Sequence, residues 1–191
     1  MSKVSVSISN DFCPQSLFLY GTYKEDGTPN FGLFCWFSYT WDDGLGVMAC
    51  IGEEKLTKDR IRATGVFSAN LVSEELLPLA DYYGTTNGYD SKKMEVMPET
   101  IRGEILNVPI IKSSPWSFEL EVRKTVMLEG SEVFLCRIRN VMAEEALLKN
   151  SLSMEELLRI AAPVVTTKET YFNLNGKVLG AWGEPKGKQK L

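Results

Sequence analysis

The sequence of 191 residues contains no histidine. A Ser-His-Asp or Cys-His nucleophile system is therefore impossible, which excludes the hydrolases and transferases that depend on one. Histidine-ligated zinc and haem sites are excluded for the same reason. Proton transfer near neutral pH has to come from carboxylates or lysines with shifted pKa values, or from a bound cofactor.

Two redox signatures are also missing. The four cysteines, Cys13, Cys35, Cys50 and Cys136, form no Cys-x-x-Cys, and most lie in strand-like sequence, so we expect no metal site. No Gly-x-Gly-x-x-Gly follows an expected strand, so a Rossmann nicotinamide site is not supported. If this chain carries out redox chemistry, a bound cofactor has to supply it.

Long apolar runs and basic clusters are absent as well. No run approaches the roughly 18 apolar residues of a membrane span, and the N-terminus lacks the apolar core of a signal peptide. The net charge of −4 argues against a nucleic-acid surface. We therefore expect a cytoplasmic protein with no membrane or nucleic-acid partner. We expect a single domain over residues 1–191, with a mobile tail at 184–191.

What is present is a series of short apolar segments separated by turn residues. We expect eight to ten strands, three short helices and hairpin turns at Asp26-Gly27, Asp43-Gly44, Glu129-Gly130 and Asn175-Gly176. The strands are expected near 3–9, 16–22, 31–40, 47–51, 66–71, 117–128, 133–142, 171–174 and 177–182. Ser153 and Glu156 form a capping box before a helix at 154–161. This pattern predicts a mainly β fold with a few helices, a closed or split β-barrel.

The stretch from Ile51 to Leu71 has the features of a phosphate site. We expect a helix with Thr57 as N-cap and Gly65 just past its end. The free N–H groups of its N-terminus, with Lys55 and Lys58 beside them, would suit a phosphate group. The alternative interpretation is an ordinary capped surface helix with solvated lysines.

Three segments together resemble a known family, the flavin reductase-like FMN-binding split barrels, and within it the flavoredoxin group. The resemblance covers most of 17–180. Its ordered motifs are Asn30, Thr57, Gly65-Val66-Phe67-Ser68-Ala69-Asn70-Leu71, Tyr83-Gly84 and Lys93-Met94. Two features depart from the family pattern: the acidic pair Glu53-Glu54 before Lys55, and Asn87-Gly88 where a Ser-Gly step is common.

The resemblance implies FMN as cofactor and a set of binding residues. Thr57 with Lys55 or Lys58 would hold the phosphate, and Lys93 would lie near the phosphate or the nicotinamide channel. Cys35, Trp36 and Phe37 would lie near the reactive side of the flavin ring. The full set expected to bind FMN is Asn30, Cys35, Trp36, Phe37, Lys55, Thr57, Lys58, Ala69, Asn70, Leu71 and Lys93. The aromatic residues could instead be barrel core, Asn70 could satisfy a turn, and each lysine could be solvated.

The resemblance further implies a homodimeric oxidoreductase, with one flavin per subunit near the interface. Electrons would pass from a reduced nicotinamide, NADH or NADPH, or another small donor through FMN to an acceptor. Two alternatives stay open: a non-catalytic electron carrier or flavin sensor, and the flavin reductase component of a two-component monooxygenase. The sequence assigns no catalytic side chain and names neither donor nor acceptor.

Overall fold

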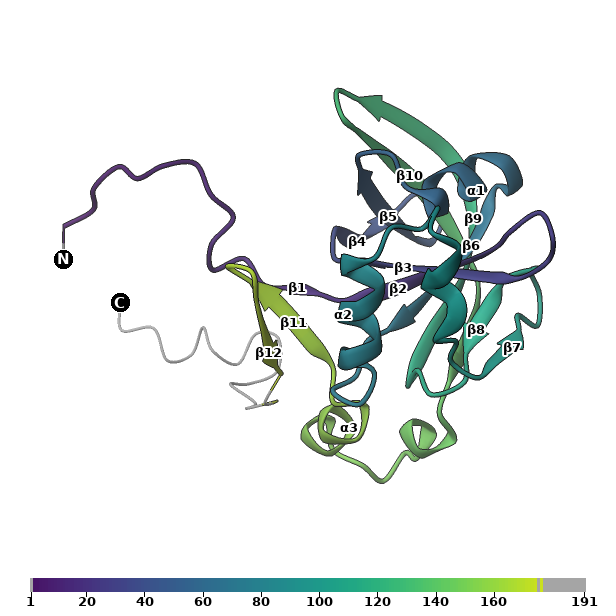
Figure 1. Ribbon diagram of the computed structural model, residues 1–191. Helices are drawn as coiled ribbons and strands as arrows, with labels where there is room; N and C mark the ends of the chain where they lie inside the picture. Colours follow the sequence, from purple (N-terminus) through teal and green to yellow (C-terminus); the bar gives the residue numbers. More distant parts are fainter. Residues whose placement is uncertain (1, 175, 177–191) are drawn as a thin grey trace.

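The computed structural model describes residues 2–174 and 176, and it is mainly β (Figure 1). The helices are α1 (Leu56–Thr64), α2 (Leu77–Thr85) and α3 (Met154–Ala161), with 3-10 helices η1 (Ser91–Glu95) and η2 (Glu145–Leu148). The first strands are β1 (Gln15–Ser16), β2 (Phe18–Tyr23), β3 (Pro29–Phe34), β4 (Phe37–Trp41), β5 (Leu45–Gly52) and β6 (Val66–Leu71). The remaining strands are β7 (Thr100–Arg102), β8 (Pro109–Ile111), β9 (Trp116–Leu128), β10 (Ser131–Ala143), β11 (Val164–Thr167) and β12 (Thr170–Asn173).

Seven strands form one antiparallel sheet in the order β3-β2-β6-β9-β10-β5-β4. The strands β3 and β4 are consecutive in the chain but lie at opposite ends of this order. Only Cys35 and Trp36 separate them, so the sheet has to curl until its two edges meet. The Phe37 ring of β4 lies 4.4 Å from the Phe18 ring of β2, centroid to centroid, across that junction. The sheet is therefore a barrel that is split between β3 and β4.

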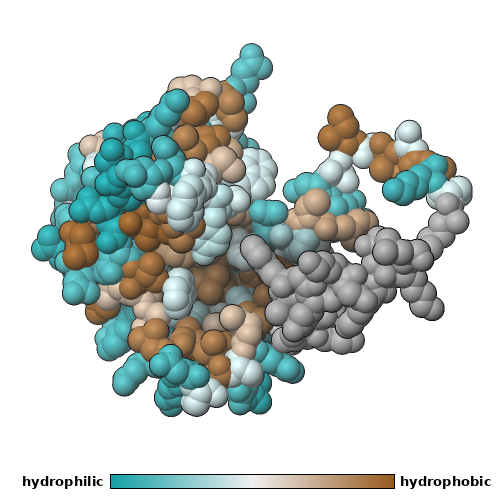
Figure 2. Space-filling model, turned by 180° about the vertical axis from the view of Figure 1, so that it is seen from behind, coloured by the Kyte–Doolittle hydropathy of each residue, from teal (hydrophilic) through white to brown (hydrophobic). Residues whose placement is uncertain are grey.

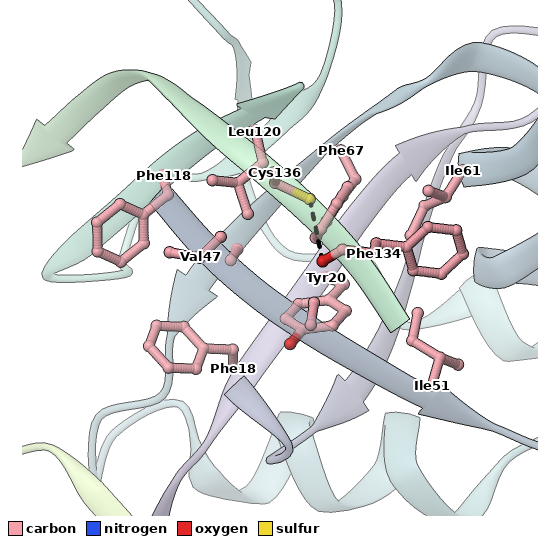
Figure 3. Close-up of a cluster of buried hydrophobic side chains, with 12 residues drawn as sticks. Phe18, Tyr20, Val47, Ile51, Ile61, Phe67, Phe118, Leu120, Phe134 and Cys136 are labelled. Carbon is pink, nitrogen blue, oxygen red and sulfur yellow. Dashed lines mark hydrogen bonds between the residues drawn. The ribbon is translucent and has the colours of Figure 1, made fainter. Parts of the chain in front are cut away.

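The interior of the barrel is filled by aromatic and aliphatic side chains that converge from its opposite walls (Figure 3). Along β2, Phe18 and Tyr20 point into this core, while Leu19 points outward. The outward side is covered by α2, whose Tyr83 ring lies parallel to the Phe31 ring at 6.1 Å. Because both faces of β2 are buried, this strand reads in the sequence as a continuous apolar run rather than an alternating one.

Many of the sequence-based expectations are confirmed. The barrel class, β6 with the bounds 66–71, the long β9–β10 hairpin and the capping box at Ser153 are all observed. Gly65 closes α1 in the left-handed conformation with φ of 71°. Each of these features depends on local sequence, such as turn residues, capping residues and short-range apolar patterns.

Three expectations are corrected, and the structure adds strands that the sequence pattern did not indicate. The single strand expected over 31–40 is two strands, since the chain crosses from one sheet edge to the other at Cys35 and Trp36. The N-cap of α1 is Lys55 rather than Thr57, whose hydroxyl is buried against Asn30. No strand forms over 3–9, where the chain finds no pairing partner, and β11 was not foreseen. The strand expected at 177–182 and the tail at 184–191 lie outside the described residues.

Two smaller sheets complete the fold. The strands β1, β11 and β12 form a separate three-stranded sheet beside the barrel (Figure 1), and β7 and β8 form a two-stranded antiparallel sheet. Within residues 2–174 and 176, no helix has the length and apolar character needed to cross a membrane.

The fully buried carboxylate of Glu119 holds the segment that follows β7. Its two oxygens accept hydrogen bonds from the backbone N–H groups of Glu104, Ile105 and Leu106. The side-chain amide of Asn140 donates a fourth, at 2.8 Å. A carboxylate suits this position because all four surrounding groups are donors.

We predict that Glu119→Gln lowers the free energy of unfolding by about 2–4 kcal/mol, because the new amide group turns a donor toward donors. Urea unfolding followed by circular dichroism measures this loss. Glu121→Gln, on the same strand and partly exposed, is the matched control, with an expected loss below about 1 kcal/mol. Equal losses in the two variants would contradict the assigned role of Glu119.

Candidate functional site

A cavity of about 280 Å³ lies where the end of β3, the start of α1, the end of α2 and the loop that follows it meet. Three of the sequence-predicted site residues, Lys55, Thr57 and Lys93, line it. A fourth, Asn30, contacts Thr57 from behind. The remaining lining residues are Gly32, Leu33, Phe34, Glu54, Leu56, Tyr83, Gly84, Thr85, Thr86, Asn87 and Gly88.

The N-terminus of α1 forms one wall of this cavity. Its N-cap, Lys55, has extended backbone angles and makes no side-chain cap hydrogen bond. The first N–H groups of a helix have no partner within the helix, and the helix dipole places partial positive charge there. Since Lys55, Leu56 and Thr57 all line the cavity, this wall favours an anion.

The hydroxyl of Thr57 is set up as a hydrogen-bond donor. The buried side chain of Asn30 donates from Nδ2 to Thr57 Oγ1 at 3.0 Å and to Thr22 Oγ1 at 3.3 Å. Because Thr57 Oγ1 already accepts from Asn30, its own proton is available for an acceptor in the cavity. Asn30 Oδ1, also buried, has no hydrogen-bond partner among the described residues.

Lys93 places a second ammonium group in the cavity wall, although its side chain is only 4% exposed. Its Nζ donates to the backbone oxygen of Tyr83 at 2.9 Å and lies 5.6 Å from the centre of the Tyr83 ring. Burial, with a further contribution from the charge of Lys55, lowers the pKa of Lys93 to about 8. A negatively charged ligand would offset that burial cost and raise the pKa again.

The acidic pair Glu53-Glu54 forms ion pairs with the two lysines at the start of α1, Lys55 and Lys58. Glu53, with a left-handed φ of 54°, forms an ion pair with Lys55 at 2.9 Å. Lys58 Nζ is held by the backbone oxygen of Glu53 and by Glu54 Oε1. Lys58 is buried and does not line the cavity. The structure thus brings Lys55 and Lys93 to the same cavity, and not Lys58.

The link between β3 and β4 begins where β3 leaves the cavity, and the predicted site residues Cys35, Trp36 and Phe37 do not line the cavity. Phe34 lines the cavity and stacks on Tyr20, with ring centroids 4.6 Å apart. Trp36 is half exposed, and a Cβ on Gly52 would lie 3.8 Å from its ring. Phe37 packs into the barrel core, whereas Cys35 packs against the cluster beneath α2. Burial raises the pKa of the Cys35 thiol, so this group is not an activated thiolate.

The other predicted site residues, Ala69, Asn70 and Leu71, lie away from the cavity. Ala69 is buried in the barrel core, and Leu71 packs against the same core from the end of β6. The side chain of Asn70 bonds the backbone of Leu19 and Ile111 at 2.9 Å each, and also Ser68 and Ser117. In this structure the three residues join β6 to its neighbours.

Some lining residues were not in the sequence-predicted set. The Tyr83 carbonyl positions Lys93, and the loop that follows α2 approaches the start of α1 closely at Gly88. A Cβ on Gly88 would lie 3.0 Å from the Leu56 Cβ and 3.7 Å from Asn30 Oδ1. The Tyr83-Gly84 and Asn87-Gly88 dipeptides were visible turn signals, but nothing in their local pattern indicated which helix the loop would face.

Comparisons with known proteins agree with one another. A family model described as "Flavin reductase like domain" matches residues 10–174. No curated protein sequence matches the chain. Flavoredoxin from Methanosarcina acetivorans has a similar structure, with a TM-score of 0.87, 19% identity, and coverage of 99% of this chain and 100% of that one.

Two further structures share the fold. The FMN-binding protein from Thermus thermophilus gives a TM-score of 0.77 at 17% identity, covering 95% of this chain and 98% of that one. Nitrilotriacetate monooxygenase component B from Bacillus cereus gives 0.77 at 13% identity, covering 91% and 97%. These likenesses show the split-barrel fold.

We predict that the burial of Lys93 makes stability depend on pH. The folded pKa of about 8 is below the ordinary value of 10.5, so between these values the unfolded chain binds more protons. The ligand-free protein should therefore gain about 1–3 kcal/mol, relative to Lys93→Met, as the pH rises from 7 to 10.

Urea unfolding of the ligand-free parent and variant at pH 7 and pH 10 measures this difference. Lys92→Met removes the neighbouring exposed lysine and is the control for loss of one charge from the same helical turn. A parent–variant difference that is the same at both pH values would contradict the assigned burial.

Proposed function

The chain belongs to the flavin reductase-like family, and on that premise we propose that it is a cytoplasmic, flavoredoxin-like oxidoreductase that holds FMN. It would take electrons from NADH, NADPH or another small donor and pass them to an acceptor. The observation that carries the proposal is the cavity in which Lys55, Thr57 and Lys93 converge on the N-terminus of α1.

The donors of this cavity fit the phosphate end of FMN. The helix N-terminus offers backbone N–H groups, Thr57 offers a hydroxyl proton, and the two lysines offer charge. Charge-assisted hydrogen bonds contribute roughly 1.5–3 kcal/mol each, so a few of them account for firm binding of one phosphate. FMN is preferred to FAD in this proposal because the sequence has no dinucleotide fingerprint.

The flavin ring would lie over the link between β3 and β4. Phe34 and Trp36 offer flat apolar surface, and the backbone N–H groups of Cys35 and Trp36 would serve the ring edge, since the Phe37 N–H already donates to the Cys35 oxygen. The side chain of Cys35 has a spectator role in the proposal, since its pKa is raised by burial. Ala69, Asn70 and Leu71 would act indirectly, by fixing β6 in the barrel wall.

FMN, when bound, supplies hydride and single-electron chemistry. The residues of this chain would bind and orient it. Thr57 and Lys55 would fix the phosphate, Lys93 would balance its charge from a buried position, and the aromatic link would exclude water from one face of the ring. No acid–base step is assigned to a side chain.

We also propose that the protein is a homodimer. The cavity is lined by the proposed phosphate-binding groups but not by Cys35, Trp36 or Phe37, so a flavin ring over that link would extend beyond the part that one subunit encloses. The half-exposed Trp36 and the exposed Tyr39 and Trp41 add apolar surface beside the site. A second subunit would cover both the ring and this surface.

Two other functions remain as alternatives: a non-catalytic electron carrier or sensor, and a reductase component that releases reduced flavin. Steady-state oxidation of NADH and NADPH, with and without added free FMN, separates them. The proposed enzyme turns over with its bound FMN, a reductase component needs added flavin, and a carrier or sensor shows no turnover in either condition.

We predict that the purified protein is yellow, with the visible absorbance bands of oxidised flavin, and that heat releases FMN rather than FAD. Absorbance spectroscopy and chromatography of the released cofactor provide the measurement. A colourless protein that also fails to bind added FMN would overturn the proposal.

We predict that Thr57→Val combined with Lys55→Met weakens FMN binding by at least about tenfold, since each substitution removes a group from the phosphate end. Riboflavin, which lacks the phosphate, should lose less than about threefold. Fluorescence titration of the two ligands provides the comparison.

Lys58→Met is the control that distinguishes the role of Lys58 from that of Lys55, because Lys58 contacts the acidic pair instead of the cavity. Its effect on FMN binding should be much smaller than that of the double variant. Equal losses for FMN and riboflavin in the double variant would show that the phosphate is held elsewhere.

A further inference from the structure

Residues 3–9 form an arm with the pattern of a strand, and the arm pairs with no strand among the described residues. Over residues 3–9, Val4, Val6 and Ile8 alternate with serines, yet the structure forms no strand there. The three aliphatic residues are 80%, 83% and 106% exposed. Figure 1 shows this N-terminal arm running away from the barrel, and Figure 2 shows hydrophobic residues along it, in open space.

The strand β4 has an edge that would serve as the partner of the arm. Within the part of the chain that the structure describes, β4 is at the end of the seven-stranded order and pairs only with β5. Hydrogen bonds from Cys50 N to Trp36 O and from Asp42 N to Gly44 O bracket the strand. Bonded pairs alternate in an antiparallel ladder, so the backbone groups of Ser38 and Thr40 face β5. Those of Tyr39 and Trp41 therefore face outward.

Within β4 this edge carries no charged side chain, proline or bulge. These are common devices that prevent pairing at natural edge strands, and β4 has the sequence Phe-Ser-Tyr-Thr-Trp. Its five residues equal the span from Val4 to Ile8. Tyr39 is on the same face as Phe37, which packs into the barrel, while Ser38 and Thr40 are on the other face. The strand thus has one apolar and one polar face, as the arm does.

We propose that the N-terminal arm of one copy of this chain pairs with the β4 edge of a second copy, as an added strand of its barrel. Val4, Val6 and Ile8 would cover Tyr39 and Trp41, with the serines of the arm beside Ser38 and Thr40. The pairing rests on the proposed dimer and specifies its contact surface.

A second copy is the occupant that the geometry favours. Asn10 and Gln15 line a shallow pocket together with Phe37 and Ser38 of the same subunit. Toward the N-terminus from this point, the arm extends away from the barrel (Figure 1). Under two-fold symmetry, each arm would reach the edge of the other copy, so one operation removes both free edges and covers both arms. Strand addition to an exposed edge is a recurring mode of recognition.

The test is sedimentation equilibrium of the full-length, FMN-loaded protein and two matched double variants. Val4→Asp with Val6→Asp places two charges on the apolar face of the arm, and should raise the dissociation constant of the dimer by at least about tenfold. Ser5→Asp with Ser7→Asp adds the same charge to the opposite face, and should change it by less than about threefold. Within one copy residues 4–8 are exposed, so both variants should fold.

A second pair of variants tests the edge. Tyr39→Pro removes an outward backbone donor without touching the ladder to β5, and Tyr39→Val keeps that donor. Only the proline variant should free the arm, seen as loss of hydrogen-exchange protection at residues 4–8.

The outcomes separate this proposal from the proposed function. A parent protein that is monomeric but binds FMN overturns both the proposed dimer and the proposed arm pairing, and leaves the proposed flavin site standing. A dimer whose dissociation constant does not change in the arm variants overturns the arm pairing alone. Protection of the arm at concentrations where the protein is monomeric would show pairing within one chain, which also overturns it.

Discussion

The rest of the structure depends on how the barrel closes. The strands β3 and β4 are separated by two residues, yet they occupy opposite edges of a seven-stranded sheet. The sheet must curl to bring those edges together, and the contacts of the Phe37 ring on β4 with the Phe18 and Tyr20 rings on β2 hold it closed. Twisted antiparallel strands with an apolar inner face favour this curvature.

The closure also creates the candidate site. The strand β3 lies beside the start of α1, so that Asn30 near its start donates to the Thr57 hydroxyl while its end lines the cavity. The same strand packs against α2 through Phe31 and Tyr83, and the backbone oxygen of Tyr83 accepts a hydrogen bond from Lys93 Nζ. The buried Asn30 amide thus links β3 to α1, and the buried Lys93 ammonium links η1 to α2. Thr57 and Lys93 are among the groups that a phosphate would use.

The charges around the cavity oppose one another. Lys93 is buried at a cost that lowers its pKa, and Lys55 is partly neutralised by Glu53. Glu54 lies in the cavity wall and draws Lys58 and Arg62 to itself. A single anionic group would find net attraction here, but less than a set of unpaired lysines would give. The acidic pair therefore tempers the affinity that the helix N-terminus and Lys93 supply.

The sequence by itself determined the features that depend on neighbouring residues: the mainly β class, β6, the left-handed Gly65, the long hairpin and the capping box at Ser153. Their physical causes, which are turn geometry, capping and side-chain alternation, act within a few residues. The ordered family motifs also placed Asn30, Thr57 and Lys93 in one set. Only the tertiary structure decided that β3 and β4 separate, that Lys93 rather than Lys58 meets Lys55 at the cavity, and that Asn70 is fully engaged inside the barrel wall. These outcomes depend on which distant segments share a sheet edge or a buried volume, and no local pattern encodes that choice.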